Sequence, residues 1–191
     1  MSSVLDSQIF NGSRRLSLVE MDAKEKVEEV FESTTAEDLL ESTEEEFVQE
    51  VMNEVEIEIP DIDFEDWEPR TSGEGGKRKL EIPLSYEGDA ELLEIPPSNH
   101  DPQNLTARVT AGTLTFSFDL NDLDSDDPQG DIEESLNHLE EGLEALQEEL
   151  QELKEEIQDD VRNEFRERKE QAKENEKKLE KLDFPSDDQD E

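Results

Sequence analysis

Apolar residues recur at helical spacing from about Leu18 to Val55, and most of the polar positions between them are Asp or Glu. Two capping boxes divide this stretch. T-A-E-D from Thr35 and T-E-E-E from Thr43 each place an acid three residues after a hydroxyl-bearing N-cap. The pattern therefore predicts an acidic helical segment over residues 17–54, preceded by a flexible arm over residues 1–16.

The last predicted helix of this segment has one apolar face. Its members are Phe47, Val48, Val51, Met52 and Val55. Such a face indicates either a helix packed on its own domain or a mobile arm that binds partner proteins. The candidate residues of a partner-binding arm are Phe47, Val48, Val51 and Met52.

The pattern changes to strict alternation, the period of a β-strand, after Val55. V-E-I-E-I-P from Val55 and K-L-E-I-P-L-S-Y from Lys79 place an apolar residue at every second position, which predicts strands with one buried face. Pro83 has no backbone N–H, so we expect its strand to lie at an edge or to contain a bulge. R-T-S-G-E-G-G-K-R-K from Arg70 predicts a flexible loop between strands.

A hairpin is the clearest element of this β region. Its apolar face combines Leu105, Ala107 and Val109 with Leu114, Phe116, Phe118 and Leu120. The opposite face carries Thr, Ser and one Arg, and a turn at Ala111 and Gly112 joins the strands because Gly adopts positive φ readily. These strands predict an α+β chain with a small antiparallel β-sandwich over residues 55–120.

A heptad pattern follows a linker at residues 121–130. Its a and d positions are Ile132, Leu136, Leu139, Leu143, Leu146, Leu150, Leu153 and Ile157, and a weaker continuation runs through Val161, Phe165, Ala172, Leu179 and Leu182. This seam predicts a coiled coil over residues 131–183, a rod on the order of 80 Å long, and Pro185 ends it before an acidic tail at 184–191. An exposed Leu seam favours self-association, so we expect a homo-oligomer through Leu136, Leu139, Leu143, Leu146, Leu150, Leu153 and Ile157.

Charges along the rod bear on how two copies would pair. The part up to Asp160 has only Lys154 as a base, whereas the part from Val161 onward is rich in Lys and Arg. Antiparallel pairing, or folding back on an acidic helix, would bring opposite charges together, although Glu149 and Lys154 would favour the parallel arrangement. We favour antiparallel pairing.

Composition changes the interpretation of all these elements. The 191 residues contain 58 acids and 18 bases, a net charge of −40, with 30% hydrophobic residues. Such a charge is typical of disorder, but here the acids occupy the polar positions of periodic segments. This indicates a folded protein whose surface is adapted to high salt, where self-repulsion is screened.

The same composition argues against several functions. An acidic surface lacks the bases that release counterions from nucleic acid, and no apolar run is long enough for a membrane-spanning helix. The first 20 residues lack the apolar core of a signal peptide, and there is no Cys. We expect a cytoplasmic protein that binds neither nucleic acid nor membranes.

One stretch resembles a known family. In I-P-P-S-N-H-D-P-Q-N-L-T-A-R-V-T-A-G-T-L-T-F-S-F the spacing of certain residues is similar to that in the closing strands of the α-crystallin domain of small heat-shock proteins. These residues are Pro97, Asp101, Pro102, Leu105, Ala107, Gly112 and Leu114, and the motif also includes Phe116. V-E-I-E-I-P-D-I-D-F-E-D-W resembles the family's opening strand. The interval from Pro60 to Pro97 is shorter than in the family and no Ile-x-Ile tail follows, which puts the family's usual oligomerisation in doubt; the other interpretation is any small β-sandwich with a Gly-turn hairpin.

Catalytic and metal-binding residues are not indicated. His100 and His138 have no motif around them. Asp122, Asp124, Asp126 and Glu133 have calcium-loop spacing, but Asp127 replaces the Gly of the loop and Pro128 follows it, so we attribute the match to chance. Asn11 and Asn104 begin glycosylation-type triplets that we regard as accidental. We expect no catalytic residue, metal or cofactor.

The resemblance implies an ATP-independent chaperone or assembly factor that binds partly folded or aggregating proteins, and gas vesicle assembly is one process that such a factor serves. The alternative is a structural or scaffold protein of a halophilic archaeon or of its virus, with the coiled coil as the functional part. In both interpretations the protein is not an enzyme and its partners are other proteins.

Overall fold

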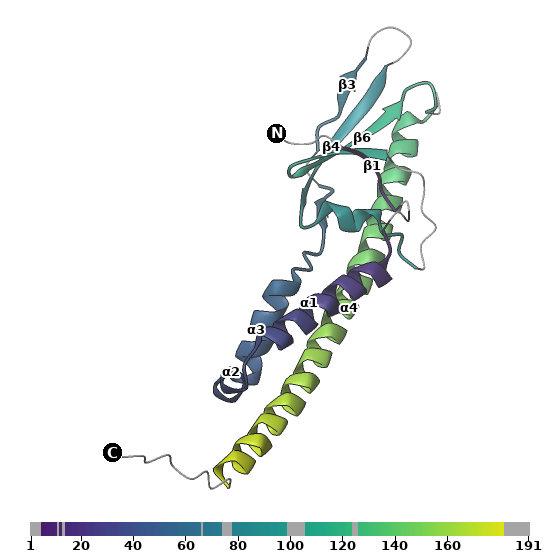
Figure 1. Ribbon diagram of the computed structural model, residues 1–191. Coiled ribbons are helices and arrows are strands. Elements are labelled where there is room, and N and C mark those ends of the chain that lie inside the picture. The colour runs from purple at the N-terminus through teal and green to yellow at the C-terminus, as the bar shows by residue number, and fades with distance from the viewer. Residues whose placement is uncertain are drawn as a thin grey trace, which may run out of the picture. The chain divides into compact units, whose positions relative to one another are not determined.

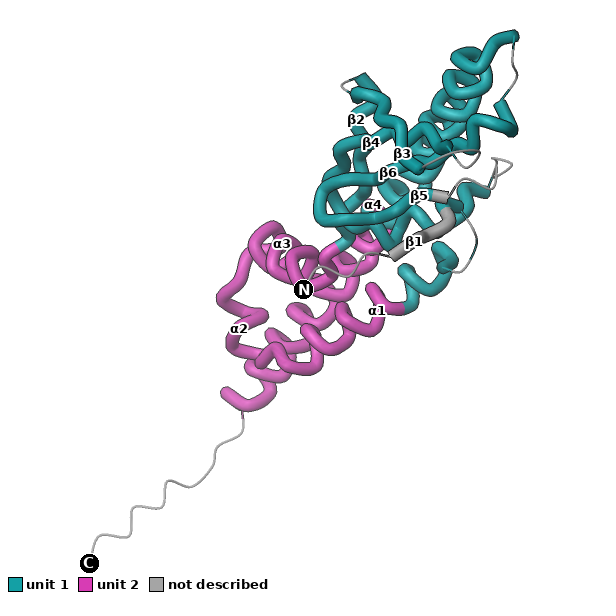
Figure 2. The backbone as a smooth tube through the Cα atoms, turned by 90° about the horizontal axis from the view of Figure 1, so that it is seen from above, with its two compact units in different colours: residues 1–21, 57–154 teal, residues 22–56, 155–191 magenta. Residues whose placement is uncertain are grey.

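The computed structural model describes residues 5–10, 12, 14–65, 67–73, 78–98, 106–123 and 126–181. The fold is α+β, as predicted. The chain divides into two compact units: unit 1 comprises Met1–Met21 and Ile57–Lys154, and unit 2 comprises Asp22–Glu56 and Glu155–Glu191 (Figure 2). The long helix α4 (Pro128–Glu180) contributes its first part to unit 1 and its second part to unit 2.

Unit 1 contains one antiparallel sheet (Figure 1). Its strands are β1 (Leu5–Gln8), β2 (Asp61–Asp63), β3 (Arg70–Ser72), β4 (Lys79–Glu87), β5 (Thr106–Thr110) and β6 (Thr113–Asp119). The order is β1-β5-β6-β4-β2, and β3 pairs with β4 beside β2. A β-sandwich needs a second, facing sheet, and all the strands among the described residues belong to this one.

The predicted hairpin is formed by β5 and β6. Thr110 pairs with Thr113 across a turn at Ala111 and Gly112, and Gly112 has φ +74°. Alternation then places one face of the sheet in the core. The fully or almost fully buried residues of this inner face are Ile82, Leu84, Ala107, Leu114 and Phe116.

Pro83 lies in a strand with neighbours on both sides, and the pairing shows how this is possible. The Tyr86 N–H donates to the carbonyl of Gly112, so the backbone groups of even-numbered β4 residues face β6. Those of Pro83 face the other side, where β3 pairs only as far as Glu81 and β2 begins at Ser85. The missing N–H falls in the gap between β2 and β3 and interrupts no strand pairing.

The predicted flexible arm over residues 1–16 is partly wrong. Leu5–Gln8 form β1 on the edge of β5, and Ile9 and Phe10 are each only 2% exposed. The Phe10 N–H donates to the carbonyl of Leu93, at the end of the 3₁₀ helix η1 (Ala90–Glu94). Burial of these two apolar side chains orders the segment.

The predicted strand from Val55 to Pro60 is also wrong. Val55 is the last residue of helix α3 (Glu44–Val55), and Glu56 caps that helix in the left-handed conformation, with φ +50°. Val55 belongs both to the helical face and to the alternating pattern, and packing in the helix prevails. The strand begins only at Asp61.

Unit 2 is helical. Helix α1 (Leu16–Ser33) enters it at Asp22 and is followed by α2 (Ala36–Glu41) and α3. Both predicted capping boxes are present, with Thr35 bonded reciprocally to Asp38 and Thr43 to Glu46. The second part of α4 completes the unit.

Helix α4 begins earlier than predicted. Pro128 is its first residue, and the Asp127 carboxylate accepts a hydrogen bond from the Gly130 N–H, as an N-cap does. The expected end at Pro185 lies outside the described residues. Among the described residues no helix is both long and apolar enough to cross a membrane.

Candidate functional site

The α4 seam, predicted as the oligomerisation surface, is buried within the single chain. Its exposed fractions are 8% at Leu136, 0% at Leu139, 3% at Leu143, 0% at Leu146 and Leu150, 6% at Leu153 and 1% at Ile157. The seam is therefore not exposed on an isolated helix, as the prediction assumed. Exposure of the seam was the argument for self-association through these residues, and that argument no longer applies.

In unit 1, polar contacts hold α4 beside the β-region. The Gln147 side-chain amide donates to the carbonyl of Pro60 at 2.8 Å, and the Ser98 N–H donates to the Glu149 carboxylate at 2.7 Å. These bonds lie outside the Leu seam. The two bonds favour the rotation of α4 about its own axis in which Leu143, Leu146 and Leu150 are buried.

The hairpin motif has a structural role in unit 1. Pro97, Ala107, Leu114 and Phe116 are buried, and Gly112 forms the turn. Asp101, Pro102 and Leu105 lie outside the described residues. The motif residues that the structure describes therefore build a core and a turn, and they present no apolar surface to solvent.

The predicted partner-binding face of α3 is buried in unit 2. Phe47, Val48, Val51 and Met52 have exposed fractions of 2%, 6%, 0% and 8%. Of the two interpretations of this face, the structure shows the helix packed on its own domain. A partner protein can reach the face only after α3 has separated from its neighbours.

Three aromatic rings from three helices meet at this face. Phe47 of α3 lies between Phe31 of α1 and Phe165 of α4, with ring centroids 5.1 and 5.0 Å away. The rings of Phe47 and Phe165 are nearly parallel, at 28°. Aromatic pairs at such distances add stabilisation beyond the apolar area they bury.

Cations from α4 cover this aromatic cluster. The Arg168 guanidinium lies 4.6 Å above the Phe31 ring and also donates to the Phe31 carbonyl, at 3.2 Å. The Lys169 ammonium lies 5.1 Å above Phe165 and donates to the carbonyl of Ser42. Each cation therefore joins α4 to the end of a neighbouring helix.

A bidentate ion pair joins the start of α3 to α4. Arg166 donates to both carboxylate oxygens of Glu44, at 2.7 and 2.5 Å. These hydrogen bonds lower the pKa of Glu44 below its ordinary value and raise that of Arg166. Glu44 is also the first residue of α3, where the helix dipole stabilises a negative charge.

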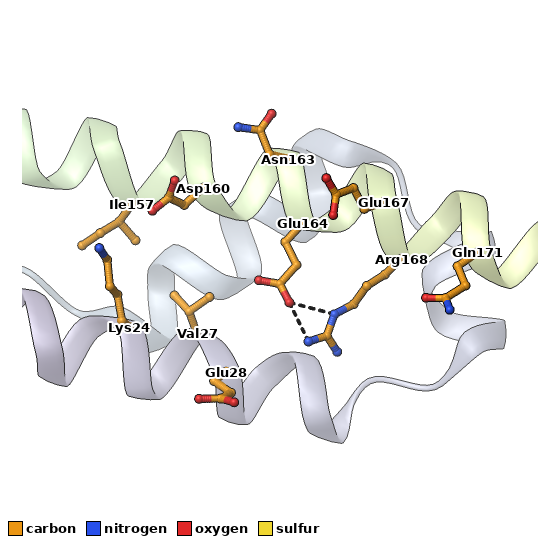
Figure 3. A pocket seen from close by; sticks show the side chains of 10 residues that line it. All are labelled: Lys24, Val27, Glu28, Ile157, Asp160, Asn163, Glu164, Glu167, Arg168 and Gln171. Carbon is orange, nitrogen blue, oxygen red and sulfur yellow. Dashed lines mark hydrogen bonds and ion pairs between the residues drawn. The ribbon is translucent and has the colours of Figure 1, made fainter.

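A groove of about 640 Å³ lies between α1 and α4 in unit 2 (Figure 3). Its lining comprises Lys24, Val27, Glu28, Ile157, Asp160, Asn163, Glu164, Glu167, Arg168 and Gln171. The Arg168 guanidinium is bonded to Glu164 at 2.6 and 2.9 Å. Since it also binds the Phe31 carbonyl, Arg168 acts here as a tie between helices, and the groove offers a ligand mainly carboxylates around Val27 and Ile157.

The acidic loop before α4 does not form the calcium-loop arrangement in the part that the structure describes. Asp122 and Asp126 are exposed, and Asp124 lies outside the described residues. Among the described residues no three His, Cys, Asp or Glu side chains are grouped so that they could hold a metal ion. Nearby, the Asp119 carboxylate accepts hydrogen bonds from the Asn121 backbone and side chain, which lower the pKa of Asp119. His138 is partly buried on α4, and His100 lies outside the described residues.

The sequence reasoning missed the aromatic cluster and its cations. A signal was present, since Ala23, Val27 and Phe31 repeat at intervals of four, and Phe165 continues the heptad seam. What the sequence did not show is that α1 and α3 cover the same stretch of α4.

Comparisons of the chain with protein-family models, with curated proteins and with solved structures gave no match.

Proposed function

We propose that the protein is a non-enzymatic, ATP-independent chaperone or assembly factor, acting in the salt-rich cytoplasm of a halophilic organism. One observation carries the proposal. The α3 face, for which the sequence allowed partner binding as well as packing on its own domain, is a continuous apolar surface, and helices of the same chain cover it. The resemblance of the β5–β6 hairpin to an α-crystallin domain supports the same class of function, with gas vesicle assembly as one candidate process.

Binding through this face requires α2 and α3 to separate from α1 and α4. Polar contacts at the rim hold the closed form: Glu44 with Arg166, the Ser42 carbonyl with Lys169, and the Val55 carbonyl with Lys26. The Glu44–Arg166 pair is exposed and contributes little, whereas the two Lys contacts are part-buried. Opening must therefore also offset the loss of the buried contacts of Phe47, and a bound client would replace them. A client with exposed apolar segments would then replace Phe31 and Phe165 against the α3 face.

Cross-linking the closed form tests this mechanism. The chain has no Cys, so Glu44→Cys with Arg166→Cys provides two unique thiols on side chains that contact each other. We expect the untreated double variant to suppress aggregation of an unrelated client protein in molar KCl, without ATP. Joining the thiols with a short bismaleimide should abolish that suppression, whereas capping each with N-ethylmaleimide should leave it.

Two outcomes would contradict the proposal. If the wild-type chain does not suppress aggregation at stoichiometric concentration, the chaperone function is wrong. If the cross-linked form remains active, the α3 face is not the client-binding surface. A scaffold protein acting through its coiled coil would give the first outcome, and burial of the seam already weakens that alternative.

A further inference from the structure

A short stretch at the start of helix α1 has a charge opposite to that of the chain as a whole. R-R-L-S-L, from Arg14 to Leu18, contains no acid and begins with two adjacent Arg residues. No other two Arg residues of the chain are neighbours. A double positive charge therefore precedes the hydroxyl group of Ser17 in a chain whose net charge is −40.

The structure leaves this stretch accessible in unit 1. Arg15, Ser17 and Leu18 are exposed, and Leu18, at 43%, is an exception among large apolar side chains that are mostly buried. Within the part of the chain that the structure describes, the Arg15 side chain has no hydrogen-bond or ion-pair partner. Arg14 is bonded to Glu91 at 2.6 Å, but this pair is exposed and contributes little. Both guanidinium groups are therefore available to a partner.

We propose that Ser17 is a phosphorylation site of a serine kinase that recognises Arg14 and Arg15. A guanidinium binds a carboxylate through two parallel hydrogen bonds, so acidic residues beside the substrate cleft of the kinase would bind both Arg side chains. An apolar pocket would bind Leu18. Charge patterns of this kind determine which substrates a kinase accepts.

The reaction transfers the γ-phosphoryl group of a nucleoside triphosphate to the Ser17 Oγ. The Oγ–P bond forms as the bond between the γ-phosphorus and the bridging oxygen breaks. The hydroxyl proton passes to an Asp of the kinase, and the nucleoside diphosphate leaves.

Binding in a kinase cleft requires an extended segment, so the first turn of α1 has to unwind. The Arg15 carbonyl holds this turn by accepting from the N–H groups of Leu18 at 2.9 Å and Val19 at 3.4 Å. None of residues 14–18 is buried, and the core of the helix begins at Val19. Helix ends fray at little cost, so Ser17 can be presented while the rest of α1 stays packed.

The phosphorylated residue also fits the folded chain. Helices α2, α3 and α4 each carry at least one acid in the first turn, whereas α1 has none. A phosphate on Ser17 would place a negative charge where the helix dipole stabilises it, beside the exposed Arg15 guanidinium. The site lies in unit 1, so the proposal does not depend on client binding at the α3 face.

Phosphorylation of the full, unmodified chain tests the site. The probe is a serine kinase that requires Arg two and three residues before its acceptor, such as the catalytic subunit of the cyclic-AMP-dependent kinase, with Mg²⁺ and ATP. The reaction is run at the lowest KCl concentration at which circular dichroism shows the chain folded. We expect the intact mass to rise by one phosphoryl group, and Ser17→Ala to abolish this rise. Arg15→Gln should lower kcat/KM roughly tenfold or more, because it removes charge-assisted hydrogen bonds to the kinase.

Ser33→Ala is the matched control. Ser33 is exposed on the same helix, but Val30 and Phe31 occupy the positions that Arg14 and Arg15 occupy before Ser17. This variant should be phosphorylated as fast as the parent. A synthetic peptide of residues 12–20 establishes that the kinase is active under the same conditions.

A second measurement uses the chain recovered from the cells that produce it. Trypsin cleavage after Arg15 and Lys24 releases a peptide of residues 16–24 in which Ser17 is the only hydroxyl residue. We expect mass spectrometry to find phosphate on this peptide. Four outcomes would each overturn the proposal: phosphorylation that survives Ser17→Ala, an Arg15→Gln chain modified as fast as the parent, a folded chain left unmodified while the synthetic peptide is modified, or a 16–24 peptide without phosphate in the recovered chain.

Discussion

Phe47 of α3 stacks on Phe165 of α4, with ring centroids 5.0 Å apart and 28° between the ring planes. The two residues come from the segments predicted as a helical arm and as a coiled coil. Their contact shows that, within unit 2, the two segments form one core. The apolar face of α3 and the second part of the α4 seam are therefore buried against each other.

We expect Phe47→Ala to destabilise unit 2 by about 3–5 kcal/mol, because it removes a buried ring that contacts two others and leaves a cavity. Urea unfolding in molar KCl, followed by circular dichroism at a helical wavelength, measures the change. Leu179→Ala is the control, since Leu179 is 62% exposed on α4, and it should change the free energy of unfolding by less than about 0.5 kcal/mol. Equal stability of the two variants would contradict the described core.

The features of the fold that the sequence predicts correctly are those formed by residues close together in the chain. Both capping boxes, the β4 alternation and the β5–β6 turn involve residues within a few positions of each other, and all are confirmed. The partner of an apolar face is a long-range property. The seam satisfied a heptad pattern equally well whether a second copy or the same chain covered it, and only the structure shows that α4 is covered by its own chain.

The errors at the segment ends have the same origin. Val55 belonged to a helical pattern and to an alternating one, and in the structure it is the last residue of α3 and is buried. Ile9 and Phe10 are adjacent apolar residues in a segment whose apolar positions follow neither a helical nor an alternating pattern, yet both are buried.

Two glycines with positive φ should respond differently to substitution. At Gly88, with φ +85°, an added Cβ would lie 2.5 Å from the carbonyl oxygen of Ile59, whereas at Gly112, with φ +74°, its nearest neighbour is 4.0 Å away. We expect Gly112→Ala to cost about 1–2 kcal/mol, the penalty of the left-handed conformation alone, and Gly88→Ala to cost more because backbone must also move. Thermal unfolding of both variants in molar KCl shows which of them is less stable. A Gly88→Ala protein as stable as the Gly112→Ala protein would contradict the described close approach of residue 88 to Ile59.

The stability of unit 2 should depend on pH through Glu44. Hydrogen bonds from Arg166 lower the pKa of Glu44 from its ordinary value of 4.5. A carboxylate with a lowered pKa in the folded state stabilises that state fully above its unfolded pKa, and this contribution disappears as the pH falls through the folded pKa. The stability difference between wild type and Glu44→Gln should therefore be constant well above pH 4.5 and shrink below it, as urea unfolding at a series of pH values would show.

Glu45→Gln is the control for this dependence. It removes the same charge from the first turn of α3 but leaves the Glu44 and Arg166 hydrogen bonds in place. General relief of acid repulsion at low pH affects both variants alike. If the two variants have the same pH profile, the ion pair contributes nothing specific to unit 2.

The acidic surface predicts folding that depends on salt. At about 0.1 M KCl the Debye length is about 10 Å, long enough for neighbouring carboxylates to repel one another, and at about 3 M it is below about 3 Å. We expect the chain to expand and lose helical and β signal at low salt, and to be compact at high salt. Circular dichroism and small-angle scattering across this range measure the transition, and spectra that do not change would contradict adaptation to high salt.

Charged substitutions in the α4 seam distinguish a core from an oligomer interface. Leu146 and Leu150 are fully buried in the single chain, in the part of α4 that belongs to unit 1. Leu146→Asp with Leu150→Asp would place two carboxylates in that core, where unpaired charge is costly. We therefore expect the double variant to lose the β signal of unit 1 as well as helical signal in molar KCl. Leu179→Asp, at an exposed seam position of the same helix, should retain both. The opposite outcome is an oligomeric parent and a double variant that is a folded monomer with its β signal intact. That outcome would show that the seam is a coiled-coil interface, as the sequence predicts.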